Sequence, residues 1–322
     1  MLTMDTLLEV KDLCVEFDTE DGRVRAVDHV SFSIRPGEIL GLVGESGAGK
    51  SLTSEAILRL IKCPPGHISG EIFYKGVDLL ALKESDMAAI RGQEIAMIFQ
   101  DAKASLNPVF RVGDQLLEAM LLHMTESKRT LRQRVLELFY KVGIPSPEHR
   151  TLDYPHQFSG GMSQRVMIGT SISCTPSLLI ADEPTTALDV TIQAQILYLL
   201  RQLAAETQAS ILLVSHDLGM ISQMCHRVIV MYAGKIVEQA PVQNIFRAPT
   251  HPYTRGLIAS IPQLDTDEER LGSIPGVMPG LLNIPLACPF HPRCEIMEQR
   301  CQKEEPELRH VGTEHLVACH KA

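Results

Sequence analysis

The feature that most constrains the fold is a glycine-rich octapeptide at residues 44–51. It matches the pattern G-x-x-x-x-G-K-[ST] at every fixed position. Glycines let the backbone turn tightly enough for successive N–H groups to point at phosphate oxygens. A helix that follows such a loop adds the positive end of its dipole. The pattern predicts a phosphate-binding loop made of Gly44, Glu45, Ser46, Gly47, Ala48, Gly49, Lys50 and Ser51.

The flanking sequence supplies the setting that such a loop needs. Residues 38–43 have the apolar pattern of a short strand, and residues 51–61 have apolar positions at helical spacing. In this setting Lys50 reaches the β- and γ-phosphates and Ser51 ligates Mg²⁺, so ATP or GTP with Mg²⁺ is the predicted ligand. The rival pattern G-x-S-x-G of serine hydrolases fails by one position, because residue 48 is alanine.

Composition limits the class of protein. The 322 residues suggest one large domain with an extension or two modest domains, and 45% apolar residues predict a sizeable core. A net charge of −9 without a long basic run disfavours nucleic acid as a partner. We find no signal peptide and no run of about 20 predominantly apolar residues, so we expect a soluble chain or one attached to a membrane through a partner.

An acidic pair follows a second apolar segment. Residues 177–183 contain four consecutive apolar residues, which is typical of a strand buried on both faces. The pair therefore falls at the carboxyl end of a strand, where open α/β sheets place ligands. Asp182 is predicted to hold Mg²⁺ through water and Glu183 to polarise the attacking water.

A third apolar segment, residues 210–215, is followed by His216. This histidine is a candidate to contact the γ-phosphate or the attacking water. A histidine at a strand end is more often a structural hydrogen-bonding group. Its position after a second buried strand favours the catalytic role.

Residues 158–165 make the prediction more specific. Ser159, Gly160 and Gly161 resemble the core of the L-S-G-G-Q motif in the nucleotide-binding subunits of ABC transporters, although Phe158 and Met162 replace its first and last residues. A serine and two glycines at a helix N-terminus form a further anion site. The resemblance covers about residues 7–255.

The resemblance assigns roles to further residues. It implies that Gln100 senses Mg²⁺ and the transmembrane partner, that Asp189 is the D-loop aspartate and that His216 is the switch histidine. It makes Phe17 a candidate to stack on adenine, while a core position on a strand explains the same residue equally well.

The same resemblance implies a fold and an assembly. The expected fold is an α/β P-loop NTPase (ABC ATPase) core with an antiparallel β subdomain, an α-helical subdomain at about 101–165 and a small Cys-rich C-terminal extension. Two ATPase subunits, either copies of this chain or related chains, face head to tail and enclose two ATP molecules. The implied partners are two transmembrane permease subunits and a solute-binding protein, and the implied location is the cytoplasmic face of the inner membrane.

Local patterns predict the remaining elements. Residues 7–40 and 68–80 have the turns of short strands, residues 112–142 are predicted to be helical with a break at 143–147, and residues 190–205 form a core-facing helix. The predicted domains are residues 1–255 for ATP binding and 256–322 for the extension.

Four of the eight cysteines lie near the C-terminus, at the spacing C-x5-C-x6-C-x17-C. In a reduced compartment such a group indicates a metal site more than a disulfide framework. Zinc motifs usually contain C-x2-C pairs, which are absent, while four thiolates also hold iron–sulfur clusters, and free thiols remain an alternative. The residues are Cys288, Cys294, Cys301 and Cys319.

The tail and residues 251–254 (His-Pro-Tyr-Thr) resemble the oligopeptide/dipeptide branch of ABC importers. This resemblance implies a structural 4Fe–4S cluster, with Zn²⁺ as the alternative, and import of peptides. An importer for nickel, glutathione or another small solute is the second hypothesis. A soluble ABC protein in translation or DNA repair is the third, which the single phosphate loop and the absence of sustained heptads disfavour.

Overall fold

The computed structural model describes residues 6–186, 188–261 and 274–322. The chain folds as two compact units, the first formed by Met1–Leu80 with Leu213–Ala322 and the second by Ala81–Leu212. The division falls inside strand β8 (Ser210–Ser215). It does not coincide with the predicted domain boundary at residue 255, which stays a prediction.

The first unit contains an antiparallel sheet with the strand order β2-β1-β4-β5. Strands β1 and β2 form a long hairpin, which turns at Glu20 and Asp21, within the segment 7–40 for which the sequence predicts short strands and turns. Buried and exposed positions alternate along β2, as expected for a sheet with one face toward the core. The strands are β1 (Leu8–Thr19), β2 (Gly22–Ile34), β4 (Gly66–Tyr74) and β5 (Val77–Asp78).

A second run of strands in this unit has the order β11-β12-β10-β9-β3. Strand β3 pairs with β9 in parallel, and the other pairs in the run are antiparallel. All residues of β3 and β9 are buried, which explains their nearly unbroken apolar sequence. The strands are β3 (Ile39–Val43), β9 (Arg227–Tyr232), β10 (Lys235–Pro241), β11 (Arg309–Gly312) and β12 (His315–Val317).

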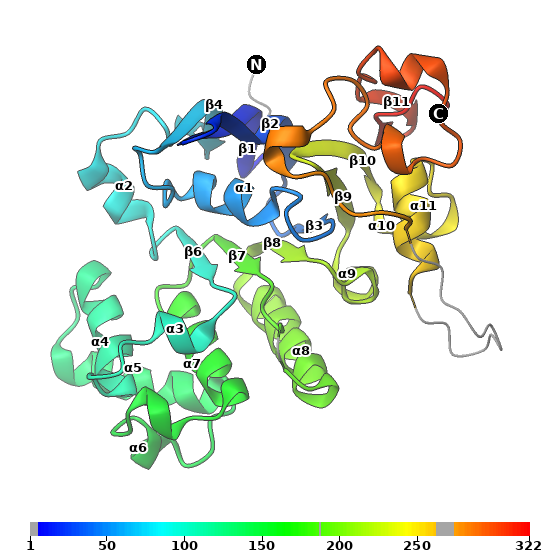
Figure 1. The fold of residues 1–322 in the computed structure, drawn as a ribbon. Coiled ribbons are helices and arrows are strands. Elements are labelled where there is room, and N and C mark those ends of the chain that lie inside the picture. Colours follow the sequence, from blue (N-terminus) through cyan, green and yellow to red (C-terminus); the bar gives the residue numbers. More distant parts are fainter. Residues whose placement is uncertain (1–5, 187, 262–273) are drawn as a thin grey trace. The chain divides into compact units, whose positions relative to one another are not determined.

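Helix α1 packs against β1 and β2, and its first two residues, Lys50 and Ser51, are the last two of the phosphate loop (Figure 1). The α-helices of the first unit are α1 (Lys50–Ile57), α9 (Leu218–Met224), α10 (Val242–Arg247) and α11 (Pro252–Ala259). We call residues 274–322 the C-terminal segment. It holds three 3-10 turns, η2 (Leu281–Asn283), η3 (His291–Arg293) and η4 (Gln299–Gln302), before β11 and β12.

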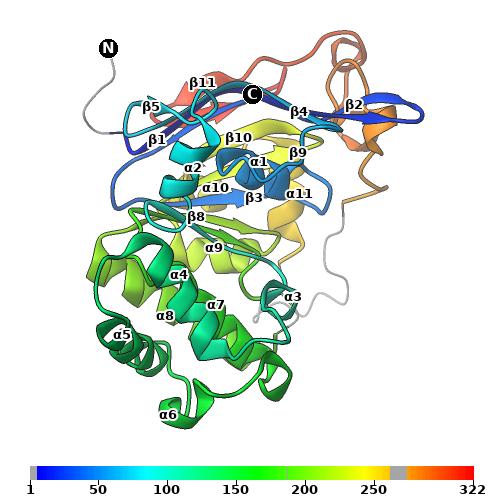
Figure 2. The ribbon, with the colours of Figure 1, turned by 90° about the vertical axis from the view of Figure 1, so that its left-hand side faces the viewer.

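The second unit combines two parallel strands with a group of helices. Strand β6 (Ile95–Ile98) pairs in parallel with β7 (Leu178–Asp182). Helices α4, α5 and α7 contact one another in all three pairs and lie side by side in Figure 2. The helices are α2 (Glu84–Ile90), α3 (Ala102–Ser105), α4 (Val112–His123), α5 (Lys128–Lys141), α6 (Pro147–Arg150), η1 (Pro155–Gln157), α7 (Gly160–Ile172) and α8 (Val190–Thr207).

Two predicted helices differ from the observed ones. The helix over 112–142 is two helices, because Ser127 caps the N-terminus of α5 by accepting a hydrogen bond from the Thr130 amide. The helix predicted to run to residue 61 ends at Ile57, because Arg59 has a left-handed backbone with φ of 52°. Among the described residues, no helix has the length and apolar character that crossing a membrane requires.

Candidate functional site

The phosphate loop connects β3 to α1, as the sequence predicts. Gly49, at the N-terminus of α1, has φ of 98°, and a Cβ atom at this position would lie 2.7 Å from the Ala26 carbonyl oxygen. A Cβ atom at Gly44 would lie 2.3 Å from the Met231 carbonyl oxygen. Both positions therefore require glycine, the first for its backbone conformation and both for close approach to another strand.

Lys50 holds the loop closed. Its Nζ donates hydrogen bonds to the carbonyl oxygens of Gly44 at 2.8 Å and Glu45 at 3.0 Å. The residue is only 5% exposed. The ammonium group is thus placed at the loop by the same backbone whose amides are expected to bind phosphate.

Glu45 is held by residues from much later in the chain. Its backbone N–H donates to the hydroxyl of Tyr253 at 2.8 Å. Its carboxylate accepts two hydrogen bonds from Arg293, at 2.7 and 3.0 Å. These hydrogen bonds raise the pKa of Arg293 above its usual range. The loop is therefore attached to α11 and to the C-terminal segment.

The acidic pair lies in the second unit together with Gln100. Because β6 and β7 are parallel and Ile98 pairs with Ala181, the residues that follow both strands meet at one edge. Gln100 Nε2 donates to Glu183 Oε2 at 2.9 Å, and Thr186 Oγ1 donates to the same oxygen at 2.8 Å. Asp182 is buried at the end of β7.

The three residues of the L-S-G-G-Q-like motif begin α7. Ser159 is the N-cap of this helix and accepts a hydrogen bond from the Met162 amide at 3.3 Å. A Cβ atom at Gly161 would lie 2.9 Å from Ile192 Cγ2, so the glycine permits close packing against the start of α8. Asp189 is the N-cap of α8 and accepts from the Ile192 amide. The motif and Asp189 therefore lie on helix ends that touch.

His216 and Phe17 belong to the first unit. His216 is exposed directly after β8 and precedes Asp217, the N-cap of α9. Phe17 is half-buried on β1, opposite Gly66 of β4, and a Cβ atom at Gly66 would lie 3.3 Å from its ring. The phosphate loop, His216 and Phe17 thus fall in one unit, and Gln100, Asp182, Glu183, Asp189 and residues 159–161 fall in the other.

The four C-terminal cysteines are neighbours in the C-terminal segment. Burial raises the pKa of Cys288 to about 11, and Cys301, Cys294 and Cys319 add to the shift as nearby thiols. The Cys288 amide donates to the Cys301 carbonyl at 3.2 Å. All eight cysteines are free thiols. Among the described residues, these four sulfur atoms do not all lie within 4.8 Å of one another.

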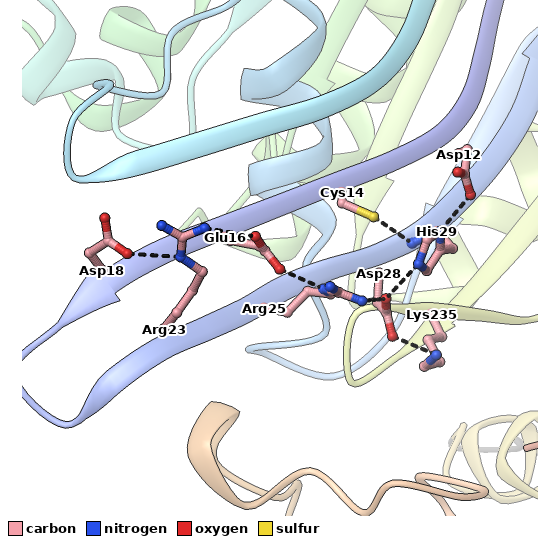
Figure 3. Close-up of polar contacts among 9 residues, drawn as sticks. All are labelled: Asp12, Cys14, Glu16, Asp18, Arg23, Arg25, Asp28, His29 and Lys235. Carbon is pink, nitrogen blue, oxygen red and sulfur yellow. Dashed lines mark hydrogen bonds and ion pairs between the residues drawn. The ribbon is translucent and has the colours of Figure 1, made fainter.

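A different group does bring ligand atoms within 4.8 Å: Cys14, Asp28 and His29. Figure 3 shows Asp28 between Arg25 and Lys235, whose nitrogens lie 2.8 and 2.5 Å from its two carboxylate oxygens. Burial alone would raise the pKa of Asp28, but these hydrogen bonds hold it below its usual value. Two cations already neutralise this carboxylate, so the group acts as an ion-pair network that joins β2 to β10.

Sequence reasoning missed two anchors, Arg293 and Glu238. Glu238 is fully buried on β10 and accepts hydrogen bonds from the backbone amides of Thr250 and His251 and from His315 Nε2. Arg293 precedes a predicted metal-ligating cysteine and has no motif of its own. In the sequence, Glu238 is a single glutamate in an apolar run and Arg293 lies in a loop-rich tail. Neither pattern predicts the residue that the side chain contacts.

Two family descriptions match the chain. The description "ABC transporter" matches residues 27–186, and "Oligopeptide/dipeptide transporter, C-terminal region" matches residues 237–301. The chain is 48% identical to the dipeptide transport ATP-binding protein DppD of Escherichia coli (strain K12), over 98% of this chain and 96% of that protein. It is 49% identical to the oligopeptide transport ATP-binding protein OppD of Bacillus subtilis (strain 168), over 98% of this chain and 89% of that protein.

Solved structures support the fold. The dimeric ATP-binding cassette MJ0796, bound to ADP and Pi, matches with a TM-score of 0.66 and 24% identity, over 73% of this chain and 98% of that one. The cbiO1 protein from Clostridium perfringens matches with a TM-score of 0.64 and 25% identity, over 76% and 92%. The predicted ABC ATPase fold is confirmed by these likenesses.

The glycine-rich loop between a buried strand and a helix, together with the match of residues 27–186 to the ABC transporter family, gives the class of the protein, an ATP-binding cassette. The near full-length identity to DppD and OppD then gives the family: the chain belongs to the ATP-binding proteins of ABC transporters, and it is an ATPase.

Proposed function

We propose that this chain is the ATP-hydrolysing subunit of a bacterial importer for dipeptides or oligopeptides. The observation that carries the proposal is identity of 48–49% to DppD and OppD along nearly the whole chain. The match of residues 237–301 to the C-terminal region of oligopeptide/dipeptide transporters supports the same assignment. These likenesses favour peptides over nickel, glutathione or another small solute.

In this proposal the phosphate loop and Lys50 bind the β- and γ-phosphates of ATP. Ser51 and Asp182 hold Mg²⁺, with Gln100 as a further contact, and Mg²⁺ neutralises charge on the phosphates. Glu183 orients the attacking water. Its carboxylate is already directed by hydrogen bonds from Gln100 and Thr186, which gives a general base a fixed orientation.

His216 is proposed to contact the γ-phosphate, and Phe17 to stack on adenine. Ser159, Gly160 and Gly161 are proposed to cap the γ-phosphate bound by a second ATPase subunit, either a copy of this chain or a related chain. The N-terminus of α7 suits this role because its first amides and its dipole attract an anion. Asp189 at the adjoining helix end is proposed to take part in the same subunit contact.

The remaining partners follow from importer function. We propose two transmembrane permease subunits, a solute-binding protein that acts through the complex and a location at the cytoplasmic face of the inner membrane. The helices at about 101–165 are proposed as the part that docks on the permease. The proposed domains are residues 1–255 for ATP binding and 256–322 for the extension.

Cys288, Cys294, Cys301 and Cys319 are proposed to hold a structural 4Fe–4S cluster. The spacing of these cysteines lacks the C-x2-C pairs that are usual in zinc motifs, and four thiolates are also the ligand set of a 4Fe–4S cluster, with Zn²⁺ as the alternative. The four residues would hold the cluster as thiolates, and binding would release protons, because burial and neighbouring thiols favour the protonated form of Cys288.

The proposal is tested with the assembled complex in lipid vesicles. ATP hydrolysis should rise when dipeptides or oligopeptides are added together with the solute-binding protein. Stimulation by nickel or glutathione in place of peptides would transfer the assignment to those solutes.

A further inference from the structure

The C-terminal segment contacts the phosphate loop through a bidentate ion pair. Arg293 donates from Nη1 to Glu45 Oε2 at 2.7 Å and from Nη2 to Oε1 at 3.0 Å. A guanidinium and a carboxylate joined by two parallel hydrogen bonds fix each other's orientation as well as their distance. The two residues are 248 positions apart in the chain.

Arg293 is itself held in place. Its side chain is only 5% exposed, and its Nε donates to the Pro275 carbonyl at 2.8 Å. The guanidinium also lies over the rings of Tyr232 and Phe290, at 5.7 and 6.0 Å from their centroids. It therefore differs from an exposed ion pair, whose long side chains lose entropy when they meet and which is screened by salt.

A second contact fixes the backbone of the same loop residue. The Glu45 amide donates to the Tyr253 hydroxyl at 2.8 Å. Tyr253 is fully buried, and its ring packs edge-on against Tyr232 with centroids 4.7 Å apart. The hydroxyl is thus a rigid acceptor for an amide at the start of the loop.

Glu45 connects Arg293 and Tyr253 to Lys50. Its carbonyl oxygen accepts a hydrogen bond from Lys50 Nζ at 3.0 Å, and the neighbouring Gly44 carbonyl accepts another. The side chain and the amide of Glu45 are fixed by distant residues, while its carbonyl orients Lys50. The C-terminal segment also reaches the loop at Gly47, where a Cβ atom would lie 3.8 Å from the Met278 sulfur.

We infer that Arg293 and Tyr253 are positioning residues for nucleotide binding, which act through Glu45 to preset the phosphate loop and Lys50. The C-terminal segment then contributes a residue that supports the nucleotide site. The inference rests on ATP binding by the loop, which the proposed function also requires, and it is independent of the solute transported.

The test measures affinity of the full-length chain for a non-hydrolysable ATP analogue with Mg²⁺, by titration calorimetry. Arg293→Met should weaken binding about five-fold, which is less than the roughly ten-fold or more expected for loss of a direct charged hydrogen bond to the ligand, because Arg293 acts only through Glu45. In a chain that already carries Glu45→Ala, adding Arg293→Met should change affinity by less than about two-fold, because the pair acts as one unit. The matched control is Arg300→Met, which breaks the exposed pair of Arg300 with Glu304 and should leave affinity unchanged.

Hydrogen exchange of residues 44–51, followed by mass spectrometry, supplies a readout that does not depend on affinity. Arg293→Met and Tyr253→Phe should both speed exchange there, and Arg300→Met should not. Tyr253→Phe removes only a hydroxyl from a packed ring, so it carries the test if Arg293→Met fails to fold.

Two results would overturn the inference. One is unchanged affinity and exchange in Tyr253→Phe and Arg293→Met. The other is an equal loss of affinity on Arg293→Met with and without Glu45→Ala, which would mean that Arg293 does not act through Glu45. Failure of peptide import in a chain that binds nucleotide as expected would count against the proposed solute and leave this inference intact.

Discussion

The carboxylate of Glu183 is held by hydrogen bonds, and its backbone has an energetically unfavourable conformation. Its φ of 45° lies in the left-handed region, which costs a residue other than glycine on the order of 1 kcal/mol or more. Gln100 and Thr186 both donate to its Oε2. Strain of this kind persists where neighbouring contacts fix a residue for function. The catalytic role of Glu183 stays a prediction, which replacement of its carboxylate tests.

Replacement of this carboxylate tests that role. Glu183→Gln should lower ATP turnover by about 100-fold or more, because an amide cannot accept a proton from water. Binding of ATP should persist, since the phosphate loop is unchanged. Turnover in the assembled complex and nucleotide affinity are measured side by side, and normal hydrolysis by the variant would remove Glu183 from the mechanism.

The cysteine assignment is tested at a single sulfur. Protein purified without oxygen should contain iron and acid-labile sulfide, and Cys294→Ser should lose both, because a serine hydroxyl is a poor substitute for a thiolate. Cys63→Ser is the matched control, since Cys63 is exposed and belongs to another part of the first unit. Stoichiometric zinc without iron would contradict the cluster and support the alternative.

At the scale of elements, sequence patterns predicted the secondary structure that short-range interactions determine. The strand, loop and helix around residues 44–51 were expected because glycine spacing and apolar periodicity act over short distances. The meeting of Gln100 with Glu183 follows from the parallel pairing of β6 and β7. In contrast, the pair of Glu45 with Arg293 depends on the tertiary fold, and no local pattern in either sequence neighbourhood encodes it.

Helix α11 carries a pH-sensitive cap. His251 is 2% exposed, and its Nδ1 accepts a hydrogen bond from the Tyr253 amide at 3.1 Å. Burial lowers the pKa of His251 from 6.5 to about 3, so the folded protein holds the neutral ring. The unfolded chain takes up the proton first, and this contribution to stability is therefore complete above pH 6.5 and is lost as the pH falls toward 3.

The corresponding prediction compares acid unfolding of the wild-type chain and His251→Asn. Asparagine retains a capping acceptor but does not titrate. Between pH 7 and pH 5 the variant should lose about 2 kcal/mol less of its free energy of unfolding than the wild type. The measurement is denaturant unfolding at each pH. An identical pH dependence of the two proteins would show that His251 does not remain neutral in the folded chain.

At the scale of the whole molecule, the predicted site residues are divided between the two units. The phosphate loop, Lys50 and His216 belong to one, and the acidic pair and the L-S-G-G-Q-like motif belong to the other. The C-terminal segment adds a third contribution, because it holds the loop through Glu45.

The most direct test of the account is peptide uptake by cells that lack this gene. Wild-type chain should restore uptake of a labelled dipeptide or oligopeptide, and Glu183→Gln, expressed at the same level, should not. Unimpaired peptide uptake in the deletion strain, together with loss of nickel or glutathione uptake, would contradict the central claim.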